Sequence, residues 1–578
     1  MASDKKAIKE KNTKEPKESA TILTAEALAK EFKEHSVAEF FKKNMQMLGL
    51  YGKVRMLTTI VHEYVTNSLD ACEEAGILPE IEVKIEELGP EYYLVTVRDN
   101  GPGLTKETVG KALAQLLAGT KFHRLIQMRG QQGIGASGCT MLSQMTTGKA
   151  IKIISGTGKG KAFACELAID PKKNEPKIYN LKDIDRDFRG LMVQARFKGV
   201  LYKESLMGPL EYLRRTAIAN PHAKIIFRSP KGERIVFNRT TTYMPKLPKP
   251  MKPHPAGATV DDIITLSQVT KAQKVSSFLK SEFDRIGDTT IERLQKLVNF
   301  DLNKDPKKLT WQEAEAIINA FKQIKFIAPS TEGLIPIGEE RIKKSLESIV
   351  QPEHVCTLTR PAKVYAGGYP FQVEVGIAYG GKAGIVSEEG SDEESKKNNV
   401  LDVMEEQNQG VKVEIMRFAN RAPLLFDAGS CAMTKAVHSI DWKRYGIKDL
   451  ENIPLTIFIN FLSVHVPYTG AGKQAVADED EIMEELRLAL MMCARKTAHY
   501  ISAKRAQIER KMKRDIFYRY IPEVADALSK ITKKEKEKLI KKLEQLVLTK
   551  LKIEDKEEED KNAKKVEEEG EEDYEEEE

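Results

Sequence analysis

Residues 63–72, EYVTNSLDAC, carry the most informative pattern in this chain. They lie in a segment predicted to be helical from about Lys53 to Ala75, where Gly76 provides a natural stop. Glu63 and Asn67 are four residues apart on this helix, so both side chains project from one face. A carboxylate beside a carboxamide can act as a general base for water and as an oxygen ligand for Mg²⁺. An exposed polar helix face would give the same spacing, so the pattern alone leaves both interpretations open.

The residues that follow this helix predict an α+β layer. IEVKIEEL (81–88) and YYLVTVRD (92–99) are strand-like and are separated by Gly89-Pro90, a hairpin signature. We expect further helices at 105–118 and near 134–144, and further strands near 150–155 and 162–168. The layer is expected to end near Phe237.

Two glycine-containing segments accompany the helix. In DNGPG (99–103), Asp99 can accept a hydrogen bond from a base amino group while the glycines let a flat ring approach, although the same letters make a good turn. GQQGIGAS (130–137) runs into a helix start that can bind anions, although it would also suit a flexible loop. The P-loop is excluded, since Pro467 and Gln474 replace residues that it requires around Gly472-Lys473. The dinucleotide fingerprint is excluded because its glycines follow a polar loop instead of a strand.

Together the three segments resemble the GHKL ATPases, which include gyrase, the heat-shock chaperone ATPase, histidine kinases and MutL. The family's E-x-x-x-N, D-x-G-x-G and glycine-lid motifs stand here as EYVTNSLDAC, DNGPGL and GQQGIGASG. The resemblance implies that Glu63 is the general base, Asn67 the Mg²⁺ ligand and Asp99 the reader of adenine. It also implies that Gly101 and Gly103 form the adenine pocket.

Three longer phrases resemble the B subunits of the archaeal type IIB DNA topoisomerases: GTKFHRLIQMRGQQGIG (119–135), RFANRAPLLFD (417–427) and VPYTGAGKQAVA (466–477). This resemblance covers about residues 24–515. It implies that Lys473 is a switch lysine that reaches the γ-phosphate of ATP, whereas the residues alone would equally fit an exposed loop lysine. It also implies a set of nucleotide contacts: Thr120, Lys121, Gly130, Gln131, Gln132, Gly133, Ile134, Gly135, Ala136 and Ser137.

The chain departs from that family pattern in two places. Thr120 stands where Ser is expected, which is a mild chemical change. Gly190-Leu191 stands where Gly-Thr often opens a late strand of the family's ATPase domain. Leu191 has no hydroxyl group, so we do not expect it to make the contact to adenine, or to a water bound to adenine, that the threonine would make.

The expected architecture is α+β with five parts. Residues 1–20 form a flexible N-terminal arm, 21–244 a GHKL-type α/β sandwich, and 245–330 a proline-rich linker with a small helix-two-turn-helix domain. Residues 331–515 form a transducer domain with a right-handed βαβ crossover, which ends in a helix of about thirty residues that begins near Asp478. A helical extension and a disordered acidic tail occupy residues 516–578.

The charge distribution favours a polyanionic partner. The net charge of +6 conceals a tail, residues 551–578, with sixteen acidic and five basic residues, so residues 1–550 carry +17. Lys443 and Arg444 beside Trp442 are candidate DNA contacts, although a solvated face would look the same. No run of eighteen apolar residues exists, so no membrane contact is expected. Six dispersed cysteines indicate reduced, structural thiols in a cytoplasmic protein.

The expected activity follows from the family resemblance. Two copies bind Mg-ATP and dimerise, and with a DNA-cleaving A subunit they form an A2B2 heterotetramer that passes one double-stranded DNA segment through another. A histidine kinase is a poor alternative, since no helix with a suitable acceptor His precedes the ATP-binding segment. A MutL-like or chaperone-like dimeric clamp is the better alternative.

Overall fold

A computed structural model describes the chain at residues 41, 43–46, 49–118, 125–130, 133–158, 160, 162–185, 187–366, 368–386, 411–450, 452–470 and 472–549. Several expected features lie outside these residues. They are Thr120, Lys121, Gln131 and Gln132, the arm at 1–20 and the acidic tail. Two further segments also lie outside: most of a helix that the apolar spacing of residues 25–47 predicts, and SEEGSDEESKKNN (387–399), whose composition is typical of a solvated low-complexity segment.

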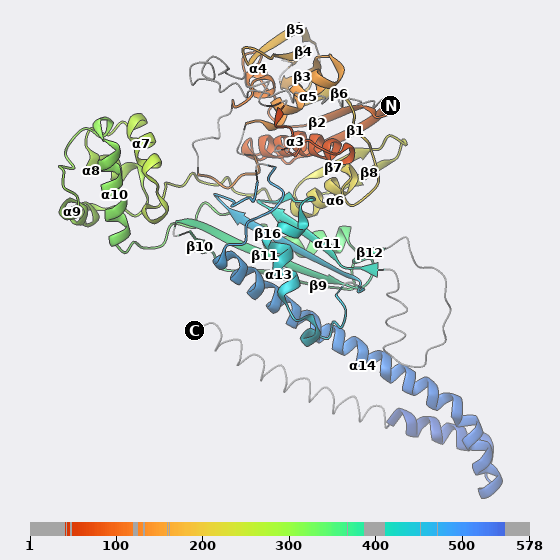
Figure 1. The fold of residues 1–578 in the computed structure, drawn as a ribbon. Coiled ribbons are helices and arrows are strands. Elements are labelled where there is room, and N and C mark those ends of the chain that lie inside the picture. The colour runs from red at the N-terminus through yellow and green to blue at the C-terminus, as the bar shows by residue number, and fades with distance from the viewer. Residues whose placement is uncertain are drawn as a thin grey trace, which may run out of the picture.

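An eight-stranded mixed sheet forms the N-terminal domain, residues 49–237, at the top of Figure 1. Its strand order is β5-β4-β3-β6-β2-β1-β7-β8. The strands are β1 (Glu80–Gly89), β2 (Tyr92–Asp99), β3 (Ile151–Thr157), β4 (Ala162–Asp170), β5 (Glu175–Ile184), β6 (Arg189–Lys198), β7 (Lys224–Arg228) and β8 (Arg234–Phe237). Its helices are α3 (Lys53–Glu74), α4 (Val109–Ala114), α5 (Gly135–Thr147) and α6 (Pro209–Ala219).

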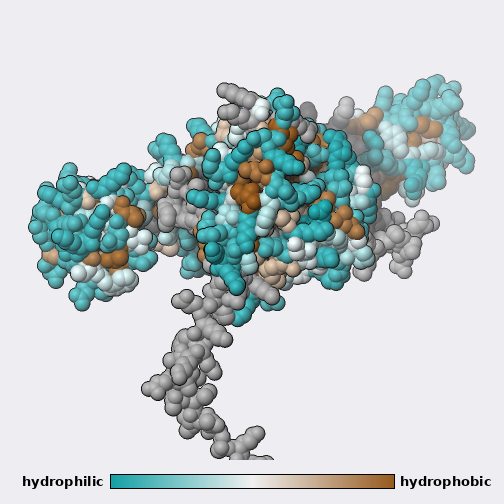
Figure 2. All heavy atoms as spheres, turned by 90° about the horizontal axis from the view of Figure 1, so that it is seen from above, coloured by the Kyte–Doolittle hydropathy of each residue, from teal (hydrophilic) through white to brown (hydrophobic). Residues whose placement is uncertain are grey.

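The hairpin predicted at Gly89-Pro90 is confirmed, since β1 pairs antiparallel with β2. Alternate residues of β1, including Ile81, Val83 and Ile85, are fully buried and face the helices. The sheet and its helices therefore enclose one apolar core. Figure 2, a view from above, shows a mainly hydrophilic surface with one apolar patch over this domain.

The helix expected at 105–118 is wrong in extent, because only Val109–Ala114 is helical. Thr105 N–H donates to the Thr108 hydroxyl at 3.0 Å, and such local side-chain bonds compete with the helix. Beyond the helix, Leu117 adopts φ 58°, a left-handed conformation that ends regular structure.

A separate helical domain stands to one side of the molecule (Figure 1). It contains α7 (Val260–Val269), α8 (Val275–Glu282), α9 (Asp288–Leu297) and α10 (Trp311–Gln323) around its own apolar core. Gly287 lies immediately before α9, and Asp305-Pro306 begins a short turn before α10. Thr259 and Thr310 cap α7 and α10 with capping boxes.

A second sheet forms the C-terminal domain, residues 334–532, in the order β10-β11-β16-β14-β15, with β9 also paired to β11. β14 and β16 run parallel, and α13 lies between them in the chain, so this part is a βαβ unit. The elements are α11 (Glu339–Ile349), β9 (His354–Thr359), β10 (Lys363–Tyr365), β11 (Tyr369–Tyr379), β14 (Glu414–Ala419), β15 (Ala422–Pro423), α13 (Ala432–Ser439), β16 (Leu455–Ser463) and α14 (Asp480–Thr532). A small separate ladder joins β12 (Ile385–Val386) to β13 (Val411–Lys412).

The last helix of this domain, α14, has 53 residues instead of the expected thirty or so. Its residues are rich in good helix formers and include no glycine, so the helix continues beyond Ile501, where regular burial against the sheet ends. It stops at Lys533, which adopts φ 54°. No helix in the described part of the chain combines the length and apolar character needed to span a bilayer.

The N-terminal and C-terminal domains share a buried interface. Ile218 and Ala219 of α6 pack in one apolar cluster with Phe418 and Phe458 of the second sheet. Ion pairs surround this cluster, including Arg55–Asp427 at 2.9 Å and Arg421–Glu73 at 2.8 Å. The two domains are therefore joined by both apolar packing and buried charge.

Candidate active site

A cavity of about 200 Å³ opens between α3 and the first sheet. Both sets of residues singled out in the sequence reach it, Asn67 from the helix and Asp99 from the end of β2. Its lining combines a few polar groups with an apolar floor: Tyr64, Asn67, Ser68, Ala71, Val97, Asp99, Gly103, Leu104, Ala112, Leu113, Ala136, Leu191 and Val193. Such a lining suits a flat, partly apolar ring with a polar edge.

Asp99 lies at the closed end of the cavity and is 5% exposed. Its Oδ1 accepts from the backbone N–H groups of Gly101 at 2.9 Å and Leu191 at 3.0 Å, and its Oδ2 accepts from the Ser68 hydroxyl at 2.8 Å. Burial raises the pKa of Asp99, while these three donors oppose that shift. The bonds fix the carboxylate, and Oδ2 keeps accepting capacity for an amino group in the cavity.

Close backbone packing behind the cavity explains why Gly103 and Gly190 have no side chain. A Cβ at Gly103 would clash with the carbonyl oxygen of Gly156, and one at Gly190 would clash with the carbonyl oxygen of Asp99. Both also adopt positive φ, 70° and 117°. Leu191, where a hydroxyl is common in the family, contributes its backbone N–H to Asp99 and an apolar side chain to the cavity wall.

The described part of the second glycine-containing segment, Gly130 and residues 133–137, is called the glycine segment below, and it lies next to Glu63. A Cβ at Gly135, the first residue of α5, would clash with Glu63 Oε2, so the carboxylate lies against the N-terminal turn of that helix. Gly133 adopts φ 58° just before it, and the Ser137 hydroxyl donates back to Gly133 O at 3.3 Å. The free N–H groups and the dipole of α5 therefore face the region around Glu63, a suitable place for phosphate.

Lys473 reaches the same region from the C-terminal domain. Its backbone is held at φ 50°, and its N–H donates to Gly470 O at 3.1 Å. Burial lowers the pKa of Lys473, whereas the charges of Glu63 and Asp70 favour its protonated form. The lysine is thus a partly desolvated cation beside the candidate base, instead of an exposed loop lysine.

The predicted residues converge in space, although 410 positions separate Glu63 from Lys473. Asn67, Asp99, Gly103 and Ala136 line the cavity, and Gly101 donates to Asp99. Glu63 lies against Gly135 at the start of α5, near Ile134 and Ser137, and its charge acts on Lys473. Gly130 lies at the base of the glycine segment, with nothing within 4 Å of its Cβ position. His62 packs edge-on against Tyr212, with 5.3 Å between the ring centroids.

Some contributors to the site were not found from the sequence. Ser68 holds Asp99, and Leu104 and Val193 form part of the apolar wall. The only sequence signal for Ser68 is its position beside Asn67 on the same helix.

The site residues fit Mg-ATP: a buried carboxylate faces an apolar slot, a helix start and a cation face the opposite end, and Asn67 supplies an exposed amide oxygen. Among the described residues, no group of three or more His, Cys, Asp or Glu is placed to hold a metal ion.

Comparison with known proteins identifies the class first. Residues 52–171 match the family model of the histidine kinase-, DNA gyrase B-, and HSP90-like ATPases, so the fold of this domain is that of a GHKL-type ATPase. Residues 329–513 match the model described as "Topoisomerase VI B subunit, transducer".

Curated relatives then define the family. The B subunit of type 2 DNA topoisomerase 6 from Methanothermobacter thermautotrophicus is 47% identical over 508 residues, which cover 87% of this chain and 93% of the relative. Its counterpart from Pyrococcus horikoshii is 46% identical over 92% of this chain and 98% of the relative, and that from Thermococcus kodakarensis is 45% identical over 90% and 95%. The chain belongs to the family of type 2 DNA topoisomerase 6 B subunits, the ATP-hydrolysing subunits of a type II DNA topoisomerase.

Proposed function

We propose that this chain binds Mg-ATP in the cavity between α3 and the first sheet and hydrolyses it with Glu63 as general base. The observation that carries the proposal is the convergence of Glu63, the α5 start and Lys473 on one region, from three separate parts of the chain. A phosphate group in this region would meet a base, free N–H groups and a cation together.

Each residue then has a distinct role. Asp99 accepts a hydrogen bond from the adenine amino group, and Gly101 and Gly103 leave room for the ring. Asn67 offers an oxygen to Mg²⁺, which neutralises phosphate charge when bound. Glu63 takes the proton of the attacking water, and Lys473 stabilises the negative charge that develops on the γ-phosphate.

We further propose that ATP binding dimerises the chain and that hydrolysis resets it, within an A2B2 assembly with a DNA-cleaving A subunit. Lys473 belongs to the C-terminal domain, so its contact with the nucleotide would link the two domains to the state of the γ-phosphate. The net charge of +17 on residues 1–550 supports contact with DNA phosphates, with affinity that falls steeply with salt.

The ATPase proposal is tested with Glu63→Gln. Turnover should fall by roughly 10²- to 10⁴-fold, because the base is lost, while affinity for a non-hydrolysable ATP analogue stays within a few-fold. Glu74→Gln, an exposed position at the end of the same helix, is the matched control and should hydrolyse ATP normally. Wild-type hydrolysis by Glu63→Gln would remove Glu63 from its role.

The assembly proposal is tested by decatenation of linked DNA circles with the chain alone and with its A subunit. Activity should require both proteins and ATP. Decatenation by this chain alone would contradict the proposed division of labour.

A further inference from the structure

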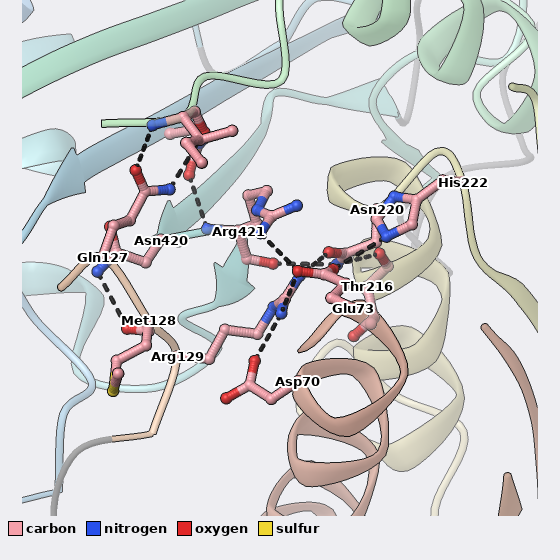
Figure 3. Close-up of polar contacts among 12 residues, drawn as sticks. Asp70, Glu73, Gln127, Met128, Arg129, Thr216, Asn220, His222, Asn420 and Arg421 are labelled. Atoms are coloured by element: carbon pink, nitrogen blue, oxygen red, sulfur yellow. Dashed lines mark hydrogen bonds and ion pairs between the residues drawn. The ribbon is translucent and has the colours of Figure 1, made fainter. Parts of the chain in front are cut away.

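One buried carboxylate, Glu73 near the end of α3, joins three parts of the molecule (Figure 3). Arg129, at the base of the glycine segment, donates through Nη2 to Glu73 Oε1 at 2.6 Å. Arg421, from the C-terminal domain, donates through Nη2 to Glu73 Oε2 at 2.8 Å. His222 Nε2 lies 2.9 Å from Oε1. All four side chains are at most 10% exposed.

The charges in this group balance. Burial alone would raise the pKa of Glu73, but Arg129 and Arg421 hold that pKa well below its usual range. Arg129 Nη1 also donates to Asp70 at 2.7 Å, so two carboxylates face two guanidinium groups. Burial lowers the pKa of His222, despite the neighbouring Glu73. Removal of one arginine would leave a buried carboxylate without compensation.

The backbone at Arg421 is strained in a way that serves this contact. Asn420 and Arg421 form the two-residue turn between β14 and β15, with φ of 49° and 68°. Such turns favour glycine at the second position, and a long side chain there costs free energy. The conformation aims the guanidinium group out of the second sheet at α3 (Figure 3).

The same turn also holds the base of the glycine segment through neutral groups. Asn420 Nδ2 donates to Met128 O at 3.1 Å. Asn220, at the end of α6, accepts from Arg129 and donates to Arg421 O at 3.2 Å. The turn therefore touches both the helix that carries Glu63 and the segment that precedes the glycine lid.

The C-terminal domain thus directs two cations at α3. Arg421 is bonded to Glu73, and Lys473 is close enough for the charge of Glu63, about three turns earlier on α3, to favour its protonated form. We propose that Arg421 is a positioning residue for ATP turnover, because its bond to Glu73 sets the placement of Lys473 relative to Glu63. This inference rests on the proposed function, since it assigns Arg421 no role except through those two residues.

The test measures ATP hydrolysis by the full chain with Arg421→Gln and Arg421→Lys, each alone and combined with Lys473→Met. Arg421→Gln should lower kcat at least about tenfold with KM for ATP within about twofold, because misplacement of catalytic groups affects turnover more than binding. Arg421→Lys should recover part of the loss. In the Lys473→Met background, Arg421→Gln should cause no further loss, since the residue acts through that lysine.

Arg360→Gln is the matched control, because Arg360 forms a similarly buried pair with Glu485 at 3.0 Å inside the C-terminal domain. It should lower Tm as much as Arg421→Gln and leave kcat near wild type. Unchanged kcat in Arg421→Gln would overturn the inference, as would an equal fold loss in both backgrounds. If Arg421→Gln does not fold, the same two comparisons with Arg421→Lys decide. Wild-type turnover by both Glu63→Gln and Lys473→Met would instead overturn the proposed function itself.

Discussion

The C-terminal domain and the helical domain attach to the rest of the chain in different ways. The C-terminal domain shares an apolar cluster and several buried ion pairs with the N-terminal domain. The helical domain has a closed core of its own. It meets the rest of the chain through fewer contacts: Met251 N–H donates to Leu125 O at 2.7 Å, and Gly257 lies against Gly368 of the C-terminal domain. Movements of the nucleotide site should therefore reach the C-terminal domain strongly and the helical domain weakly.

The largest loss of stability should come from replacing a buried phenylalanine by alanine, a substitution that can be made in each of the two regions. Phe418→Ala removes a fully buried ring at the shared cluster, and Phe278→Ala removes one from the helical core. Each should cost roughly 3–5 kcal/mol of local stability. ATP turnover should fall in Phe418→Ala and survive in Phe278→Ala. Calorimetry measures the stability of both variants and ATPase assays measure their turnover. An equal loss of turnover in both variants would contradict the stronger coupling of the nucleotide site to the C-terminal domain.

A pH effect of intermediate size should arise at Glu414, which contacts Arg214 and Arg215 across the shared interface. Burial raises the pKa of Glu414 to about 7, against the pull of these arginines. Because the pKa of this carboxyl in the unfolded chain is about 4.3, the stabilisation is fully present below about pH 4. It is lost as the pH rises toward 7, by roughly 4 kcal/mol. Glu414→Gln should flatten the pH dependence of the unfolding free energy between about pH 4 and pH 7. An unchanged slope relative to wild type would contradict the assignment.

Arg55 should contribute less, at the rim of the same interface. It forms a bidentate pair with Asp427 at 2.9 and 3.0 Å and stacks on Phe426 at 4.4 Å. Arg55→Met should lower the unfolding free energy by about 1 kcal/mol, since the Asp427 side chain is 42% exposed and solvent weakens the ion pair. Denaturant titration measures this loss, which Asp427→Asn should partly reproduce.

The least change is expected in the linkers of the helical domain. Lys249 and Glu332 form an ion pair between the two linkers at 3.2 Å, with side chains 75% and 73% exposed. Lys249→Ala should leave Tm within roughly 1 °C of wild type. A clear drop in Tm or in ATP turnover would show that the helical domain is coupled more tightly than its contacts suggest.

Local patterns explain which parts of this picture were accessible from the sequence. The i, i+4 spacing of Glu63 and Asn67 and the Gly89-Pro90 hairpin depend on neighbouring residues, so they could be predicted. The bond from Arg421 to Glu73 spans 348 positions and depends on how two sheets pack, which no local pattern encodes. The length of α14 was missed because its second half follows helix propensity rather than burial.

The length of α14 has a mechanical consequence. Its first turns pack against β9 and β11, and the remainder projects away from the second sheet (Figure 1). Between Ile501 and Pro522, the proline inside this helix, α14 rises about 30 Å at 1.5 Å per residue, so a tilt of about 10° at the sheet would displace that point by about 5 Å. The helix therefore has the geometry of a lever, because a small rotation where it leaves the sheet is amplified along its length.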